Sequence, residues 1–189
     1  MEVLKNAAVF ASGSGSNFQA LVDGAKNQEI RVSIKLLVCN KKDAYVITRA
    51  KESGIQVLLI DYKNFSVLEI ESMLIRKLKE LDIDYIFLAG FMKKLSPLII
   101  SAFRNKIVNI HPSLLPKYKG LNGVRQALDN GDTTIGVTVH YVDEKLDNGP
   151  IIIQDSICVE GLTEDLVYKK VHELEHEMYK NAINIIMNK

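Results

Sequence analysis

An amide and an imidazole stand two residues apart near the middle of the chain, at Asn109 and His111. They follow a short apolar run, Ile107 and Val108, of the kind that forms a buried strand. Side chains two residues apart in a strand point to the same face, so both groups could face one reacting atom. A neutral amide donor beside a titratable ring suits a reaction in which an oxygen gains negative charge while a proton moves. The alternative is a strand that ends in a proline-shaped turn, with His111 in a capping role.

A glycine-rich segment, residues 12–17, separates an apolar run from a pattern of helical spacing. Glycines adopt backbone angles closed to other residues, so successive N–H groups can converge on an anion at the start of the next helix. The segment is not a dinucleotide fingerprint, because Phe18 stands where the third glycine belongs, and it lacks the lysine of a Walker loop. It favours a small phosphate as ligand. The alternative is a tight turn with a Ser or Asn helix cap.

A third pattern, His172-Glu173-Leu174-Glu175-His176, satisfies the H-E-x-x-H signature of zinc enzymes. Catalytic zinc requires a third protein ligand, and the chain offers no downstream histidine or other plausible ligand. We therefore interpret the two histidines as residues of a polar helix face and expect no metal.

Composition restricts the possible partners. The chain has 189 residues, 47% of them hydrophobic and 25% charged, so we expect one globular domain over residues 1–189. A formal net charge of +1 gives no overall field for nucleic acid or an anionic membrane, and we expect neither as a partner. With no membrane-spanning run and no signal-peptide pattern, we expect a cytoplasmic protein. Cys39 and Cys158 are expected to be reduced, packed thiols.

Short apolar runs alternate with helical patterns through the first half of the chain. The expected strands are residues 7–11, 32–39, 57–60 and 84–89, and the expected helices are residues 18–25, 44–53 and 66–81. Continuous apolar strands separated by helices favour parallel pairing, so the pattern predicts an α/β fold with a doubly wound, mostly parallel sheet. Ligands in such sheets bind beyond the carboxyl ends of the strands. The segments 13–17, 90–95 and 109–116 all emerge there.

The last third of the chain has a different pattern. Residues 117–123 contain two glycines and no apolar period, which predicts a mobile loop over the site. Residues 133–142 and 150–159 are β-branched runs that we expect to pair across a polar turn. A long final helix is expected to begin at Thr163, with a buried stripe formed by Val167, Val171, Leu174, Met178, Ala182 and Ile185.

Four segments together resemble the phosphoribosylglycinamide formyltransferase family in order and spacing: residues 12–17, 88–92, 109–116 and 146–150. The resemblance spans nearly the whole chain. It implies a Rossmann-like formyltransferase fold with a C-terminal antiparallel strand and a long final helix. It also implies transfer of a formyl group from 10-formyltetrahydrofolate to the glycyl amine of 5-phosphoribosylglycinamide, giving N-formylglycinamide ribonucleotide in de novo purine (IMP) biosynthesis.

The resemblance also implies roles for individual residues. Asn109, His111 and Asp147 correspond to the family's catalytic residues. The residues matched to the ribonucleotide site are Gly13, Ser14, Gly15, Ser16, Asn17 and Glu175. Those matched to the folate site are Met92, Lys93, Lys94, Leu95, Asn109, Leu146, Asp147 and Gly149. The implied partners are these two small molecules, with no metal, and the implied assembly is a monomer or a homodimer.

The chain departs from the family pattern in two places. Ser66, Val67 and Leu68 follow Phe65 where the family often has a folate-contacting Ser-Arg pair, and the 117–123 segment lacks the family's histidines. His140 lies on an expected strand near Asp147 and is interpreted either as a support for the turn or as a packed core residue. Two other functions stay open, a hydrolase that deformylates the folate with water and a non-catalytic binding protein.

Overall fold

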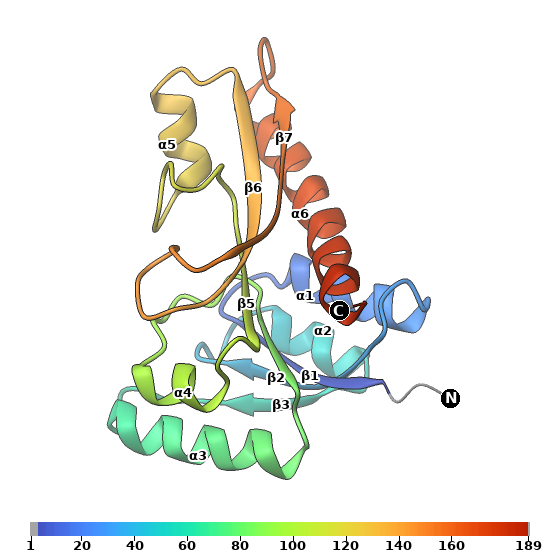
Figure 1. The fold of residues 1–189 in the computed structure, drawn as a ribbon, viewed down its shortest axis with the longest axis vertical. Helices are drawn as coiled ribbons and strands as arrows, with labels where there is room; N and C mark the ends of the chain where they lie inside the picture. Colours follow the sequence, from blue (N-terminus) through green and yellow to red (C-terminus); the bar gives the residue numbers. More distant parts are fainter. Residues whose placement is uncertain (1–3, 189) are drawn as a thin grey trace.

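A computed structural model describes residues 4–188 of the chain and contains one seven-stranded sheet in the order β3-β2-β1-β4-β5-β6-β7 (Figure 1). The first five strands pair in parallel, whereas β6 pairs antiparallel with both β5 and β7. The strands are β1 (Lys5–Ala11), β2 (Val32–Cys39), β3 (Gln56–Leu59), β4 (Tyr85–Leu88), β5 (Ile107–His111), β6 (Thr134–Tyr141) and β7 (Ile151–Cys158).

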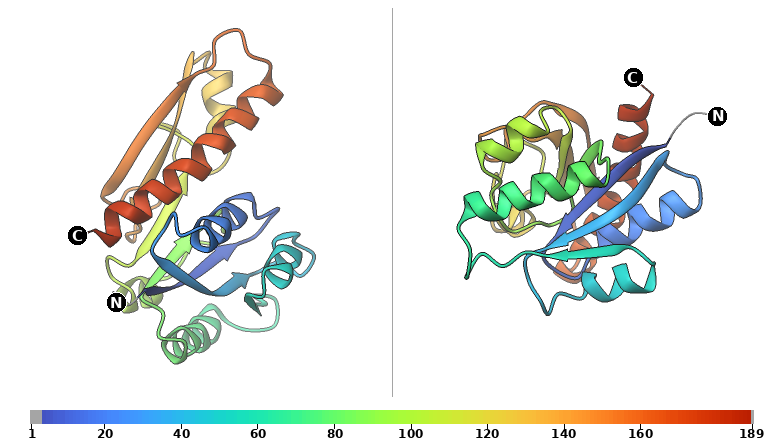
Figure 2. Two further views of the ribbon diagram at one scale, coloured as in Figure 1. Left: turned by 90° about the vertical axis from the view of Figure 1, so that its right-hand side faces the viewer. Right: turned by 90° about the horizontal axis from the view of Figure 1, so that it is seen from below.

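Helices cover both faces of the parallel part of the sheet (Figure 2). They are α1 (Ser16–Lys26), α2 (Val46–Glu52), α3 (Val67–Glu80), α4 (Pro97–Ala102), α5 (Gly123–Asp129) and α6 (Glu164–Met187). Alternate residues of β1 divide between two cores, as strand geometry requires. Val9 packs in the core that includes α1, α2 and α6, and Phe10 packs in the core that includes α3 and α4.

The predicted α/β fold is confirmed, with the expected strands, the expected antiparallel pair and the long final helix all present. Helices α4 and α5 were not predicted from the sequence. Each has fewer than eight residues, too few turns for an apolar period to be visible. α5 begins at Gly123, so the expected 117–123 loop ends where this helix starts.

Two predictions about packing were wrong. Ile185 is 37% exposed, whereas Ile183 and Ile186 are buried. Many buried residues of α6 recur at steps of four. Because an α-helix has 3.6 residues per turn, each such step shifts the buried stripe slightly around the helix. Cys158 is exposed rather than packed, because it lies at the end of the edge strand β7. Cys39 is buried as expected.

The strand order reverses between β1 and β4, which lie side by side while their following connections run to opposite sides of the sheet. Such a topological switch point opens a crevice outside the carboxyl ends of the strands. Residues 12–15 leave β1 at this crevice, and residues 89–95 leave β4 there. The backbone N–H of Ser12 donates to the carbonyl of Gly90 at 3.1 Å, which ties the two segments together.

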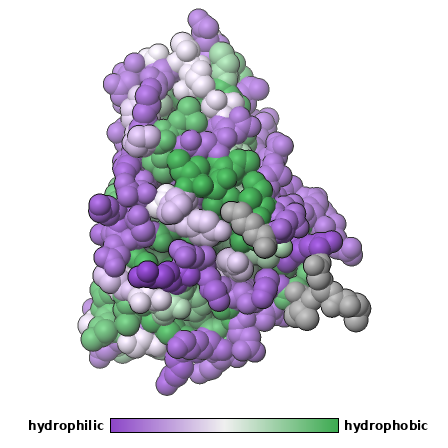
Figure 3. Space-filling view, viewed as in Figure 1, coloured by the Kyte–Doolittle hydropathy of each residue, from purple (hydrophilic) through white to green (hydrophobic). Residues whose placement is uncertain are grey.

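Hydrophilic residues cover most of the face seen in Figure 3, and hydrophobic residues gather near its centre. Within residues 4–188, no helix is long and apolar enough to cross a membrane.

Candidate active site

A cavity of about 530 Å³ lies at the carboxyl ends of the parallel strands. Fourteen of the fifteen residues expected at the two substrate sites line it, and Gly149 is the exception. The lining residues on this list are Gly13, Ser14, Gly15, Ser16, Asn17, Met92, Lys93, Lys94, Leu95, Asn109, His111, Leu146, Asp147 and Glu175.

The glycine loop forms one end of the cavity and leads into α1. Gly15 has φ 77°, and a Cβ there would lie 2.5 Å from Val46 Cγ2, so this position requires glycine. Gly13 has open space around it. The first N–H groups of a helix have no intrahelical acceptor, so the start of α1 presents donors at the loop.

Asn17 adds a polar group to this end of the cavity. Its side-chain oxygen is buried and has no hydrogen-bond partner among residues 4–188. Buried polar atoms are normally paired, so a ligand that carries a hydroxyl or amine donor would complete this site.

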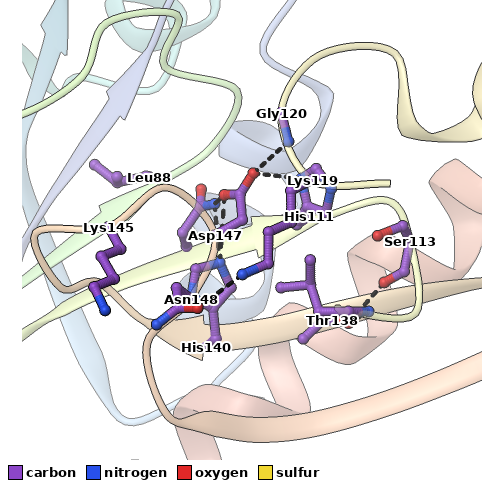
Figure 4. Close-up of polar contacts among 12 residues, drawn as sticks. Leu88, His111, Ser113, Lys119, Gly120, Thr138, His140, Lys145, Asp147 and Asn148 are labelled. Atoms are coloured by element: carbon purple, nitrogen blue, oxygen red, sulfur yellow. Dashed lines mark hydrogen bonds and ion pairs between the residues drawn. The ribbon is translucent and has the colours of Figure 1, made fainter. Parts of the chain in front are cut away.

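Asn109 and His111 occupy alternate positions of β5 and both line the cavity, as the two-residue spacing predicted. β5 is the last parallel strand, and antiparallel pairing sets Asn109 opposite His140 of β6. The chain after β5 is held by Thr138, whose hydroxyl donates to the carbonyl of Ser113 at 2.6 Å (Figure 4). This hydrogen bond fixes the direction in which residues 112–116 leave β5.

Asp147 lies in the polar turn between β6 and β7, but it is only 9% exposed. Its backbone has φ 45°, a left-handed conformation that Asp tolerates. This turn brings the carboxylate to the end of β5 (Figure 4). Oδ2 lies 3.6 Å from His111 Nδ1, and Oδ1 accepts from Asn109 Nδ2 at 3.4 Å. The three predicted catalytic residues therefore meet.

The segment between β5 and α5 closes over these groups through two backbone contacts. His111 Nε2 lies 2.8 Å from the carbonyl oxygen of Tyr118. A carbonyl only accepts, so Nε2 carries a hydrogen, and Nδ1 is the nitrogen that faces Asp147. The N–H of Gly120 donates to Asp147 Oδ2 at 2.8 Å.

His140, for which two interpretations were open from the sequence, belongs to the same cluster. Its ring is buried, with Nδ1 2.9 Å from the carbonyl of Tyr141 and Nε2 3.3 Å from Asn109 Nδ2. The first contact places the hydrogen on Nδ1, so Nε2 accepts from the Asn109 amide and orients it. Burial lowers the pKa of His140, against the effect of Asp147 3.8 Å away.

The segment after β4 also lines the cavity, and side chains of neighbouring elements hold it in place. Buried Ser12 accepts the N–H of Met92 at 2.8 Å, and its hydroxyl donates to Asn40 at 2.5 Å. Glu71 of α3 accepts from the backbone and hydroxyl groups of Ser96 and so fixes the end of the segment. The ammonium of Lys93 lies 5.2 Å from the centre of the Tyr62 ring.

Two residues of α6 reach the cavity, Glu175 and His172, of which only Glu175 was predicted. His172 Nδ1 contacts Glu175 Oε2 at 2.6 Å, so His172 pairs with a carboxylate of its own helix. Within residues 4–188, no group of three or more His, Cys, Asp or Glu side chains could hold a metal ion.

Gly149 lies outside the cavity, against β6. A side chain there would collide with the carbonyl oxygen of Tyr141, so glycine is required for the turn to pack on the strand. In this structure Gly149 allows the turn that carries Asp147, two residues earlier, to pack against β6.

Residues 5–183 match the Formyl transferase family. The chain belongs to this family. It is 40% identical over 186 residues to phosphoribosylglycinamide formyltransferase of Bacillus subtilis (strain 168), a match that covers 97% of this chain and 95% of the relative. It is also 40% identical to the trifunctional purine biosynthetic protein adenosine-3 of Drosophila melanogaster, of which it spans only 14%.

The fold of this formyl transferase is also shared with solved structures. Glycinamide ribonucleotide transformylase 1 from Geobacillus kaustophilus superimposes with a TM-score of 0.93 at 42% sequence identity. The match covers 97% of this chain and 99% of that one.

Proposed function

We propose that this formyl transferase moves a formyl group from 10-formyltetrahydrofolate to the glycyl amine of 5-phosphoribosylglycinamide. We also propose that residues 1–189 form a single domain. The product would be N-formylglycinamide ribonucleotide, in de novo purine biosynthesis. The observation that carries the proposal is the meeting of Asn109, His111 and Asp147 in one cavity, between a glycine loop at a helix start and the segment after β4. The names of the similar enzymes from Bacillus and Geobacillus support this acceptor.

In the proposed reaction the amine attacks the formyl carbon, the bond from that carbon to the folate nitrogen breaks, and a proton passes from the amine to the folate. Asn109 donates from Nδ2 to the formyl oxygen as that oxygen gains charge, and the formyl oxygen takes the place of Asp147 Oδ1 as the acceptor of one amide hydrogen. His111 is the second donor, and we propose that the formyl oxygen takes the place of the Tyr118 carbonyl at Nε2. Asp147 orients the His111 ring through Nδ1 and accepts the amine's proton, directly or through water.

The two substrates would contact different residues of the cavity wall. The glycine loop and the start of α1 would bind the phosphate, with Asn17 and Glu175 beside the sugar. Residues 92–95, Leu146 and the Asp147 turn would hold the folate. The chemistry needs no metal, because amide, imidazole and carboxylate groups provide both charge stabilisation and proton transfer.

A steady-state experiment separates this proposal from its two alternatives. Purified protein is incubated with 10-formyltetrahydrofolate, with and without 5-phosphoribosylglycinamide, and folate deformylation is followed. Turnover that requires the ribonucleotide supports the transferase. Equal turnover without it would identify a hydrolase, and binding of folate without any turnover would identify a binding protein.

A further inference from the structure

His172 and Glu175 form a hydrogen-bonded pair in the wall of the cavity. The pair spans one turn of α6, with 2.6 Å between His172 Nδ1 and Glu175 Oε2. The two side chains differ in exposure, 7% for Glu175 and 55% for His172. The carboxylate is thus buried in the wall, and the imidazole lies at its rim.

A carboxylate buried to this degree needs a partner, because desolvation penalises its charged form. In the described chain His172 is the side chain that donates a hydrogen bond to it. Oε1, the other carboxylate oxygen, accepts no hydrogen bond from residues 4–188 and is not fully enclosed. His172 therefore fixes one oxygen of Glu175, a residue that lines the cavity, and leaves the second oxygen without a hydrogen bond from residues 4–188.

The second histidine of the H-E-x-x-H pattern has a different environment. His176 does not line the cavity, its Nε2 is buried with no hydrogen-bond partner among residues 4–188, and burial lowers its pKa. The hydrogen bond with Glu175 raises the pKa of His172, and the charge of Glu175 adds to this effect. The pKa values of the two histidines on this helix are therefore shifted in opposite directions.

We propose that His172 is a positioning residue for the acceptor substrate: it holds Glu175 so that Oε1 accepts a hydroxyl or amine hydrogen of the ribonucleotide. This role rests on the proposed function. Because the pair is strongest when the ring is protonated, ribonucleotide binding should weaken as pH rises and His172 loses its proton, while folate binding should not. On α6, His172 interacts electrostatically with Glu175 and His176, and the other charged side chains that line the cavity are Lys93, Lys94, Asp143, Lys145 and Asp147.

The test compares three variants in steady-state kinetics from pH 6 to 9. His172→Ala removes the hydrogen-bond donor, and His172→Asn keeps a neutral N–H near the position of Nδ1. Glu173→Gln is the control, because Glu173 is exposed on the same helix and does not line the cavity. For His172→Ala we expect KM for the ribonucleotide to rise roughly ten-fold, the usual effect of losing one hydrogen bond to a charged group. KM for the folate and kcat should stay within about two-fold of wild type.

For His172→Asn we expect an intermediate KM for the ribonucleotide that no longer depends on pH across this range. An unchanged KM in His172→Ala, or equal increases in both KM values, would overturn the proposal. If wild type shows no ribonucleotide-dependent turnover, the proposed function has failed, and the pair is tested by NMR titration of the His172 ring. Its pKa should fall in Glu175→Gln, and an unchanged pKa would overturn the proposal independently of activity.

Discussion

The carboxylate of Asp147 accepts the backbone N–H of Gly120 at 2.8 Å, so one side chain both faces His111 and anchors the segment that covers it. This contact links the β6–β7 turn to the chain that follows β5. Asp147 therefore has an electrostatic role toward the ring and a structural role toward the covering segment, and the two roles respond to different substitutions.

Asp147→Asn separates these roles. Asparagine keeps an oxygen that can accept from Gly120, but it loses the negative charge and the ability to take the amine's proton. We expect kcat to fall by at least about 100-fold, the lower end of the usual contribution of general acid–base catalysis. The melting temperature should stay within about 4 °C of wild type, because the change is isosteric.

Asp147→Ala is the matched comparison, since it also removes the acceptor for Gly120. A folded Asp147→Asn protein with kcat within a few-fold of wild type would mean that Asn109 and His111 act without this carboxylate.

The two glycines of the loop after β1 should respond differently to substitution. Gly13→Val places a side chain in open space, so the fold should tolerate it while phosphate approach is blocked. We expect KM for the ribonucleotide to rise far more than KM for the folate, measured with each substrate varied in turn. Equal effects on both constants would locate the phosphate elsewhere.

Gly15→Val provides the contrast, because the new side chain meets Val46 and the backbone has φ 77°. We expect it to lower the free energy of unfolding by at least about 1 kcal/mol, measured by urea denaturation.

His140 should make stability depend on pH. Burial lowers its pKa in the folded protein, so the neutral ring is favoured there. Below about pH 6.5 the unfolded chain takes up a proton that the folded protein does not, and the free energy of unfolding falls. Urea denaturation from pH 8 to pH 5 should therefore show a larger loss of stability for wild type than for His140→Gln. If the free energy of unfolding depends on pH in the same way in wild type and in His140→Gln, the His140 ring has the same pKa in the folded and unfolded states.

Chelators should leave formyl transfer intact. In the described residues no three metal-ligating side chains come together, and Nδ1 of His172 is already bonded to Glu175. Activity is measured before and after dialysis against EDTA, with metal content determined by mass spectrometry. Stoichiometric zinc together with activity lost on its removal would contradict this prediction.

Local pattern was enough to predict much of this fold and site. The apolar runs located the parallel strands, and the two-residue spacing of Asn109 and His111 placed both on one face of β5. The glycine loop before α1 could also be predicted, because its pattern lies within six adjacent residues.

Features that depend on contacts between residues far apart in the sequence could not be predicted from local pattern. The burial of Asp147 requires the turn after β6 to fold back onto β5, and the role of His140 requires the register that sets it opposite Asn109. Helix α5 is too short to give a periodic signal. His172 reaches the cavity only because α6 packs against α1, β6 and β7.

The fate of the formyl carbon distinguishes formyl transfer to the ribonucleotide from hydrolysis of the folate. Wild-type protein is supplied with 10-formyltetrahydrofolate labelled with ¹³C in the formyl group, together with 5-phosphoribosylglycinamide, and the products are followed by ¹³C NMR. We predict that the label moves to the glycyl nitrogen, giving a ¹³C-formamide signal on the ribonucleotide at the rate of folate release. Label that accumulates as free formate, with the ribonucleotide unmodified, would contradict formyl transfer to this amine.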